Sequence, residues 1–173
     1  MDTADALSAK YLVNKCLYRC LFTIPINSGV FPIFKTAIPV ATIDAYLATD
    51  YQVNTVKRFV LNVGRPSPEL AQWFQTNKED HAAFITAWNP LGKPTSDTTN
   101  RIAEQKLIVE IQARNLPYLQ GEGKDPSGRW PSEPSLLVFG ISLESAKELV
   151  ERFRQDGFIY VGSDATPQLI LLR

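Results

Sequence analysis

The sequence contains few of the residues that build metal sites and disulfide frameworks. Its 173 residues include one histidine and two cysteines. A structural zinc site needs about four such ligands, so this chain alone cannot assemble one. Cys16 and Cys20 are four positions apart on an expected helix, and we interpret them as small buried hydrophobic side chains in preference to a redox or metal role.

Neither sign of charge is in excess. The 18 lysines and arginines balance the 18 aspartates and glutamates, and no block of five or six like charges occurs. A DNA- or RNA-binding surface usually carries a surplus of lysine and arginine. We therefore expect no nucleic acid as the main partner.

No hydrophobic run is long enough to cross a bilayer. The most apolar early stretch, residues 17–25, is too short and is interrupted. Asp2 and Asp5 precede the first lysine, which is unlike a signal peptide. With 45% hydrophobic residues, the composition is that of an ordinary globular protein. The expectation is a cytoplasmic protein with no membrane partner.

The first 40 residues are predicted to form a helix followed by an extended arm. In residues 4–21 apolar side chains recur every three to five positions, as on one side of a helix. Pro25, Pro32 and Pro39 then prevent a helix or a central strand in residues 24–40. Two alternatives stay open, an arm packed over its own domain or an arm exchanged within a homodimer. Residues 41–173 are predicted to be a single domain.

The rest of the chain alternates between apolar or β-branched runs and helices that begin at capping residues. Ser67, Thr95 or Ser96, and Ser142 are the expected helix caps. The expected strands cover residues 46–53, 57–63, 84–88, 118–120, 135–139, 158–161 and 168–172. From residue 82 onward the order is strand, helix, strand, strand, helix, strand, which is the ferredoxin-like split-βαβ order. The predicted fold class is α+β: an antiparallel sheet with this core, preceded by a β-hairpin and an N-terminal helical arm.

Chain direction in this fold brings distant polar residues to one end of the sheet. Strands and helices that alternate up and down would place several loop ends together. The residues expected there as ligand-binding groups are Trp88, Asn89, Asn100, Glu122, Trp130, Ser135 and Gln155. His81 falls at the opposite end of its strand, so a Ser-His mechanism using Ser135 is disfavoured.

Three carboxylates, Glu122, Asp125 and Glu133, lie near this end. If two faced each other in a partly dry pocket, one pKa would rise and the two would form an acid–base pair, with Glu133 and Asp125 as the catalytic candidates. They could instead hold Mg²⁺ or Ca²⁺ beside a phosphate substrate. The structural alternative is that Asp125 only opens the type I turn Asp-Pro-Ser-Gly, and that the glutamates lie in solvent.

The tryptophans and asparagines have two interpretations as well. Trp88 and Trp130 could wall an apolar slot for a planar ligand, or they could cap the hydrophobic core at the ends of strands. Asn100 is expected on the inner side of its helix, where a buried amide needs hydrogen-bond partners. Asn89, Glu133 or a ligand could supply them.

Several of these segments resemble a bacterial family of small proteins, the domain-of-unknown-function family numbered 3293. The resemblance rests on F-I-T-A-W-N-P at residues 84–90, G-E-G at 121–123, W-P-S-E-P-S-L-L-V at 130–138, and Phe153 with Gln155. It covers about residues 46–172. The family tends to have Phe-Gly-Gln where this chain has Phe153-Arg154-Gln155. The resemblance implies no established activity, substrate or cofactor.

Three functions follow as hypotheses. The leading one is a non-enzymatic module that binds a small polar ligand or a protein partner at the rim of the sheet. The second is a metal-assisted hydrolase or phosphodiesterase that uses Glu133, Asp125 and Glu122. The third is a structural protein that forms oligomers through residues 24–40. No cofactor is expected, apart from Mg²⁺ or Ca²⁺ in the hydrolase hypothesis.

Overall fold

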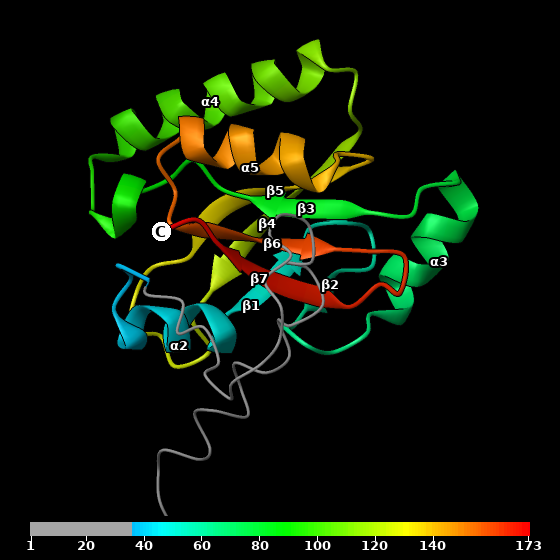
Figure 1. Ribbon diagram of the computed structural model, residues 1–173, viewed down its shortest axis with the longest axis horizontal. Helices are drawn as coiled ribbons and strands as arrows, with labels where there is room; N and C mark the ends of the chain where they lie inside the picture. The colour runs from blue at the N-terminus through cyan, green and yellow to red at the C-terminus, as the bar shows by residue number, and fades with distance from the viewer. Residues whose placement is uncertain (1–35) are drawn as a thin grey trace, which may run out of the picture. The chain divides into compact units, whose positions relative to one another are not determined.

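A computed structural model describes residues 36–173 (Figure 1). Within them, helices and strands alternate in an irregular order along the chain. The helices are α2 (Val40–Ala48), α3 (Pro68–Asn77), the short 3₁₀ helix η2 (Pro90–Gly92), α4 (Asp97–Ala113) and α5 (Leu143–Arg152). The strands are β1 (Asp50–Val53), β2 (Phe59–Leu61), β3 (Ala82–Ile85), β4 (Tyr118–Lys124), β5 (Glu133–Phe139), β6 (Gly157–Val161) and β7 (Pro167–Leu171).

The strands form one seven-stranded sheet in the order β2-β1-β4-β5-β3-β6-β7. Every neighbouring pair is antiparallel. The expected α+β class with an antiparallel sheet is therefore confirmed. β5 is the middle strand, which agrees with its uninterrupted apolar run.

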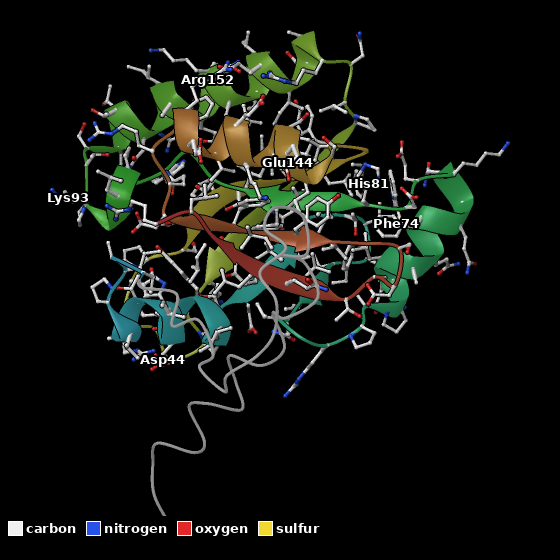
Figure 2. The ribbon with its side chains drawn as sticks, in the orientation of Figure 1. Asp44, Phe74, His81, Lys93, Glu144 and Arg152 are labelled. Carbon is white, nitrogen blue, oxygen red and sulfur yellow. The ribbon has the colours of Figure 1, made fainter. Side chains whose placement is uncertain are left out.

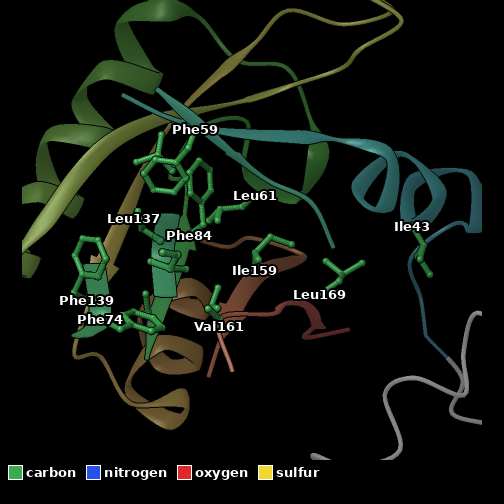
Figure 3. Close-up of a cluster of buried hydrophobic side chains, with 14 of the residues drawn as sticks. Ile43, Phe59, Leu61, Phe74, Phe84, Leu137, Phe139, Ile159, Val161 and Leu169 are labelled. Atoms are coloured by element: carbon green, nitrogen blue, oxygen red, sulfur yellow. The ribbon is translucent and has the colours of Figure 1, made fainter. Parts of the chain in front are cut away.

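Both faces of the sheet are covered by hydrophobic side chains. Residues that alternate along β3 and β5 belong to separate clusters, because successive side chains on a strand point to opposite faces. One cluster includes Phe84, Leu137 and Phe139, packed with Leu70 and Phe74 from α3 (Figure 3). The other includes the intervening β3 and β5 residues, packed against α4 and α5. Figure 1 shows α4 and α5 side by side over this second face.

The predicted helix starts are confirmed. The hydroxyl oxygens of Ser67, Ser96 and Ser142 accept hydrogen bonds from the backbone N–H groups three residues further on, each at 3.2 Å. These bonds satisfy amide groups that have no partner within the helix. The cap at Ser96 fixes where α4 begins and hence where Asn100 lies.

Some predicted boundaries were wrong. Residues 46–48 were predicted to lie in a strand but form the last turn of α2. This helix begins after Pro39, whose carbonyl accepts hydrogen bonds from the N–H groups of Thr42 and Ile43. The expected strand ends at residue 120, so the sequence alone predicts a glycine-acid loop from residue 121. In the structure residues 121–124 continue β4: residues 121–123 pair with both β1 and β5, and Lys124 pairs with β1. Glycines in this stretch allow neighbouring strands to approach closely.

The end of α5 was also predicted incorrectly. The helix stops at Arg152, and Arg154 takes the left-handed conformation with φ 56°. The Gln155 N–H donates to Val150 O and the Arg154 N–H donates to Glu151 O, which is the Schellman pattern. From the sequence alone Gly157 is the expected end of this helix, because glycine favours the position after a helix, but it is the first residue of β6.

Residues 36–173 form one compact unit. The predicted N-terminal helix and most of the arm lie outside the described residues, so both stay predictions. None of the helices in residues 36–173 combines the length and the apolar character needed to cross a membrane.

Candidate functional site

Several loop ends meet at one end of the sheet. β3 and β4 both pair antiparallel with β5, so their C-terminal ends lie at the same edge as the start of β5. Figure 1 shows η2, the start of α4 and the end of α5 together on the left. Figure 2 places Lys93 at this end and His81 at the other. The chain directions are those expected from the sequence, and we call this end the rim.

The side chains of Asn89 and Asn100 form the centre of the rim. The Asn89 backbone N–H donates to Asn100 Oδ1 at 2.9 Å, and Asn100 Nδ2 donates to Asn89 Oδ1 at 3.0 Å. Thr95 joins them: its N–H donates to Asn89 Oδ1 at 3.0 Å, and its hydroxyl donates to Asn100 Oδ1 at 2.6 Å. Asn100 is only 2% exposed. The inward asparagine expected on α4 has its partners within the protein.

Glu133 is held by the same network. Asn89 Nδ2 donates to Glu133 Oε1 at 2.6 Å. Burial raises the pKa of Glu133, and the hydrogen bond from Asn89 offsets part of that rise. No described residue donates a hydrogen bond to the second carboxylate oxygen. Glu133 therefore has one oriented oxygen and one that is able to accept a further donor.

Tyr46 is close enough to Glu133 to feel its charge, and sequence reasoning did not include Tyr46 in the site. Burial and the negative charges of Asp156 and Glu133 raise the pKa of the Tyr46 hydroxyl to about 12. Asp156 is 5% exposed and forms an ion pair with Arg173. Tyr46 was assigned to a strand and Asp156 was unremarkable in sequence, so no signal connected them to Glu133.

The backbone of the rim is unusual at two positions. Asn89 and Leu91 both have positive φ, at 47° and 59°. Asparagine tolerates this region, but leucine rarely adopts it. The Leu91 N–H donates to Arg154 O at 2.7 Å, which fixes η2 against the end of α5. Such strained residues persist where surrounding contacts hold them, and they concentrate at functional sites.

Trp88, Ser135 and Gln155 serve this network as structural supports. Gln155 Nε2 donates to the Trp88 carbonyl at 2.9 Å, and the Trp88 indole N–H donates to Glu104 Oε2 at 3.2 Å. The Ser135 hydroxyl donates to the Glu133 carbonyl at 3.0 Å. The structure thus brings together six predicted site residues: Trp88, Asn89, Asn100, Glu133, Ser135 and Gln155. It adds Glu104 as the partner of the indole.

Glu122 lies on the opposite face of the sheet from Glu133. In the register of β4 and β5, Gly123 is opposite Glu133, and Glu122 is opposite Pro134. Side chains of directly opposed residues share a face, and neighbouring ones alternate. The side chains of Glu122 and Glu133 therefore do not face each other, although both lie near the rim.

Asp125 and Trp130 belong to the loop between β4 and β5. Asp125 is 2% exposed, and its carboxylate accepts bonds from the N–H and hydroxyl of Ser127 and from the N–H and Nε of Arg129. Burial alone would raise the pKa of Asp125, but these bonds lower it to about 2. The Arg129 guanidinium lies 5.0 Å from the centroid of the Trp130 ring. These contacts are those of a fixed turn.

The rim has no obvious set of metal ligands. Among residues 36–173, no group of three or more histidine, cysteine, aspartate or glutamate side chains is arranged to hold a metal ion. The polar groups at the rim are side-chain amides, the hydroxyls of Thr95 and Ser135, and the carboxylate of Glu133. This arrangement can accept and donate hydrogen bonds to a polar molecule.

Comparison with known proteins finds one matching family model, and that model carries no known activity. No curated protein and no solved structure matches the chain significantly. Residues 85–157 match the model of a family described as "Protein of unknown function (DUF3293)". The matched range contains Asn89, Asn100, Glu133 and Gln155, and it confirms the resemblance noted in the sequence. Residues 85–157, which carry most of the rim, are therefore similar to the DUF3293 family, over a shorter range than the resemblance noted in the sequence.

Proposed function

We propose that the rim is a binding site for a small polar ligand and that the protein acts as a non-enzymatic binding module. The observation that carries the proposal is the state of Glu133. Its carboxylate is partly buried, one oxygen is fixed by Asn89 at 2.6 Å, and the other accepts nothing from the described residues. A partly buried carboxylate with spare acceptor capacity favours a partner that brings a donor.

The surrounding groups indicate the class of ligand. Glu133 and Asp156 bring two negative charges near the Tyr46 hydroxyl, and Arg173 offsets one of them. The remaining negative charge favours a ligand that presents an ammonium, a guanidinium or a neutral N–H group to Glu133. The Tyr46 hydroxyl is able to donate to an acceptor on the same molecule.

The amide network supports this proposal because it holds the Glu133 carboxylate in a fixed orientation. Asn89, Asn100 and Thr95 bond one another, so the Glu133 carboxylate is oriented before any ligand arrives. Preorganisation lowers the entropy lost on binding. Left-handed backbone at Asn89 and Leu91 is a further sign of a site whose geometry is specified.

A thermal-shift screen with small amines, guanidines, amino acids and neutral amides tests the proposal. A compound of this class is expected to raise the melting temperature of the protein, and Glu133→Gln should weaken its binding about tenfold or more, because a charge-assisted hydrogen bond is lost. Glu122→Gln is the matched control, since it removes a carboxylate from the same end but the opposite face. Equal loss in both variants, or no response to the panel, would contradict the proposal.

The hydrolase hypothesis has less support. Its second acid, Asp125, already accepts bonds from Ser127 and Arg129 and has a pKa lowered to about 2. A general acid needs a pKa near the working pH. Burial moves the pKa of Glu133 in that direction, whereas the pKa of Asp125 moves the opposite way. Stabilisation by Mg²⁺ or Ca²⁺ that disappears in Glu133→Gln would favour the hydrolase over the binding module.

For the architecture of residues 82–161 we propose the ferredoxin-like split-βαβ fold. The parallel strands β3 and β4 flank β5, and β6 lies on the other side of β3. α4 connects β3 to β4, and α5 connects β5 to β6. Both helices cover the same face, as the split-βαβ arrangement requires.

A further inference from the structure

Asp156 is a buried acid whose acceptor capacity the fold leaves unused. It is 5% exposed and lies between the end of α5 and the start of β6. Its Oδ1 atom is enclosed by the protein and accepts no hydrogen bond from a described residue. Arg173 Nη2 forms an ion pair with this oxygen but is not in line for a hydrogen bond. Buried carboxylates usually accept several hydrogen bonds, so Asp156 is able to accept more donors than the protein supplies.

The short turn η2 places Asp156 near Glu133. Asn89, directly before the turn, donates to Glu133 Oε1 at 2.6 Å. A Cβ at Gly92, the last residue of the turn, would lie 3.8 Å from Asp156 Oδ2. Three residues of chain span at most about 11 Å, and a 3₁₀ turn spans less. The carboxylates of Glu133 and Asp156 therefore lie at the two ends of one short turn.

Tyr46 is within electrostatic range of both acids. Burial, followed by the negative charges of Asp156 and Glu133, raises the pKa of its hydroxyl, and the charge of Arg173 lowers it. This agrees with the arrangement around η2. The rim thus contains a second carboxylate in addition to the one oriented by Asn89.

The Arg173 side chain is able to leave Asp156 without a change in the backbone. The side chain is 42% exposed. The backbone is held separately, because Arg173 O accepts a hydrogen bond from the Thr36 hydroxyl and the Leu172 N–H donates to Asp156 O at 2.9 Å. An ion pair to a buried acid adds little net stability, since both groups lose water when it forms. The Arg173 guanidinium is therefore a cation that another cation can replace.

We infer that Asp156 is a second cation subsite of the rim, filled by Arg173 when no ligand is bound, and that the ligand is a small aliphatic dication such as a diamine. One cationic group binds Glu133, and the other displaces Arg173 from Asp156. A ligand with a single cationic group binds at Glu133 only and leaves Arg173 in place. The inference rests on the proposed function, because it requires the Glu133 subsite. The distance between the two carboxylates then selects the length of the ligand.

Titration calorimetry of the full chain with diamines and monoamines tests the second subsite. The probes are 1,3-diaminopropane, 1,4-diaminobutane and 1,6-diaminohexane, each compared with the monoamine of the same chain length. At least one diamine is expected to bind about tenfold tighter than its monoamine, because the linked second group meets Asp156 at high effective concentration. D156N keeps the side-chain shape and should abolish this advantage without changing monoamine binding. D164N is the matched control, because Asp164 lies in an exposed turn at the other end of β6.

R173A tests the displacement. It should bind the diamine severalfold tighter than the wild type, since the competing guanidinium is gone and every molecule is competent to bind. Weaker diamine binding in R173A would make Arg173 part of the receptor and overturn the displacement. If R173A does not fold, D156N still decides, because it removes the buried charge instead of leaving it unpaired.

The outcomes separate this inference from the proposed function. Monoamines that bind through Glu133 without any advantage for a diamine, or an advantage that persists in D156N, would overturn the second subsite and leave the proposed function intact. Failure of every amine to bind would also overturn the second subsite. The proposed function fails only if guanidines, amino acids and neutral amides fail as well, or if binding does not depend on Glu133.

Discussion

Asn89 and Asn100 bond each other twice across eleven residues of sequence: the Asn89 backbone N–H donates to Asn100 Oδ1 at 2.9 Å, and Asn100 Nδ2 donates to Asn89 Oδ1 at 3.0 Å. Asn89 belongs to the loop after β3, and Asn100 to the first turn of α4. The pair therefore closes the β3–α4 connection on itself. It also aims Asn89 Nδ2 at Glu133 on a third element. The buried Asn100 and the half-buried Asn89 thus hold the loop together and orient the carboxylate.

Removing Asn100 should destabilise the protein strongly. Asn100→Ala leaves the Asn89 N–H and the Thr95 hydroxyl without their acceptor. Thr95 is exposed, so water replaces the acceptor of its hydroxyl, whereas the Asn89 N–H is partly buried. An unsatisfied buried group costs about 1–3 kcal/mol, so we expect a loss of about 1–3 kcal/mol in urea unfolding. Asn77→Ala is the control, because Asn77 is exposed and donates one bond to the Trp73 carbonyl. A loss at Asn100 no larger than that at Asn77 would show that the network contributes little.

Gly121 and Gly123 should respond very differently to alanine. A Cβ at Gly121 would lie 2.4 Å from Gln52 O and 2.8 Å from Phe84 Cε2, whereas one at Gly123 would lie 3.6 Å from Thr49 Cγ2. Overpacking of this kind costs about 1–3 kcal/mol, and an ordinary contact is tolerated within about 0.5 kcal/mol. Chemical denaturation of G121A and G123A measures the difference. Similar midpoints would contradict the close β1–β4 approach.

Arg154 is expected to be a suboptimal residue at its position. Its backbone is left-handed with φ 56°, in which any side chain with a Cβ is disfavoured by roughly 1–2 kcal/mol. R154G should therefore be more stable than R154A by about 1 kcal/mol, after the entropy that glycine gains in the unfolded chain is subtracted. Thermal unfolding of the two variants checks this. If R154A is the more stable, the Schellman ending of α5 is wrong.

The stability conferred by Glu133 should decrease as pH rises. Burial raises its folded pKa above the ordinary value of 4.5, so just above that pH the native state binds more protons than the unfolded chain. Stability then falls as pH rises through this window and stays low above the folded pKa. E133Q cannot titrate, so its stability relative to the wild type should increase as the pH rises above the ordinary glutamate pKa of 4.5 and level off above the raised folded pKa. A difference that is constant with pH would contradict the raised pKa.

Asp125 should show the opposite dependence. Its folded pKa is lowered from 3.8 to about 2, so its contribution is complete above the unfolded value and is lost as pH falls through about 2. D125N should be less stable than the wild type at neutral pH, and the two should converge in acid. D164N is the control, because Asp164 Oδ1 accepts a single backbone bond from Thr166 in an exposed turn. An equal loss in D164N would mean that the Ser127 and Arg129 bonds add nothing.

Sequence patterns predicted what depends on local chemistry. The caps at Ser67, Ser96 and Ser142 are recognisable because serine is a preferred N-cap residue when it precedes a helical apolar repeat. The meeting of Asn89 with Glu133 followed from chain direction alone.

Features that depend on packing between distant segments could not be predicted from the sequence. Tyr46 was predicted to lie in a strand because aromatic and β-branched residues favour strands. It lies in α2, because this propensity is weak and the tertiary context overrides it. Glu122 looked like a neighbour of Glu133 until the register of β4 and β5 placed their side chains on opposite faces. The pairing register of two strands depends on packing with side chains far along the chain. The eleven residues between Glu122 and Glu133 therefore do not determine which face each side chain occupies.

The strand order has a consequence for biosynthesis. β1 and β2 join the sheet only through β4, since Asp50 pairs with Lys124 and Val53 with Gly121. A ribosome must add roughly seventy residues after β1 before its partner exists, which takes about 4–14 s at 5–20 residues per second. During that interval the emerging hairpin exposes Phe59 and Leu61 together with an unpaired backbone edge. We expect nascent chains truncated before residue 118 to associate with chaperones, and chains extended past residue 139 to release them.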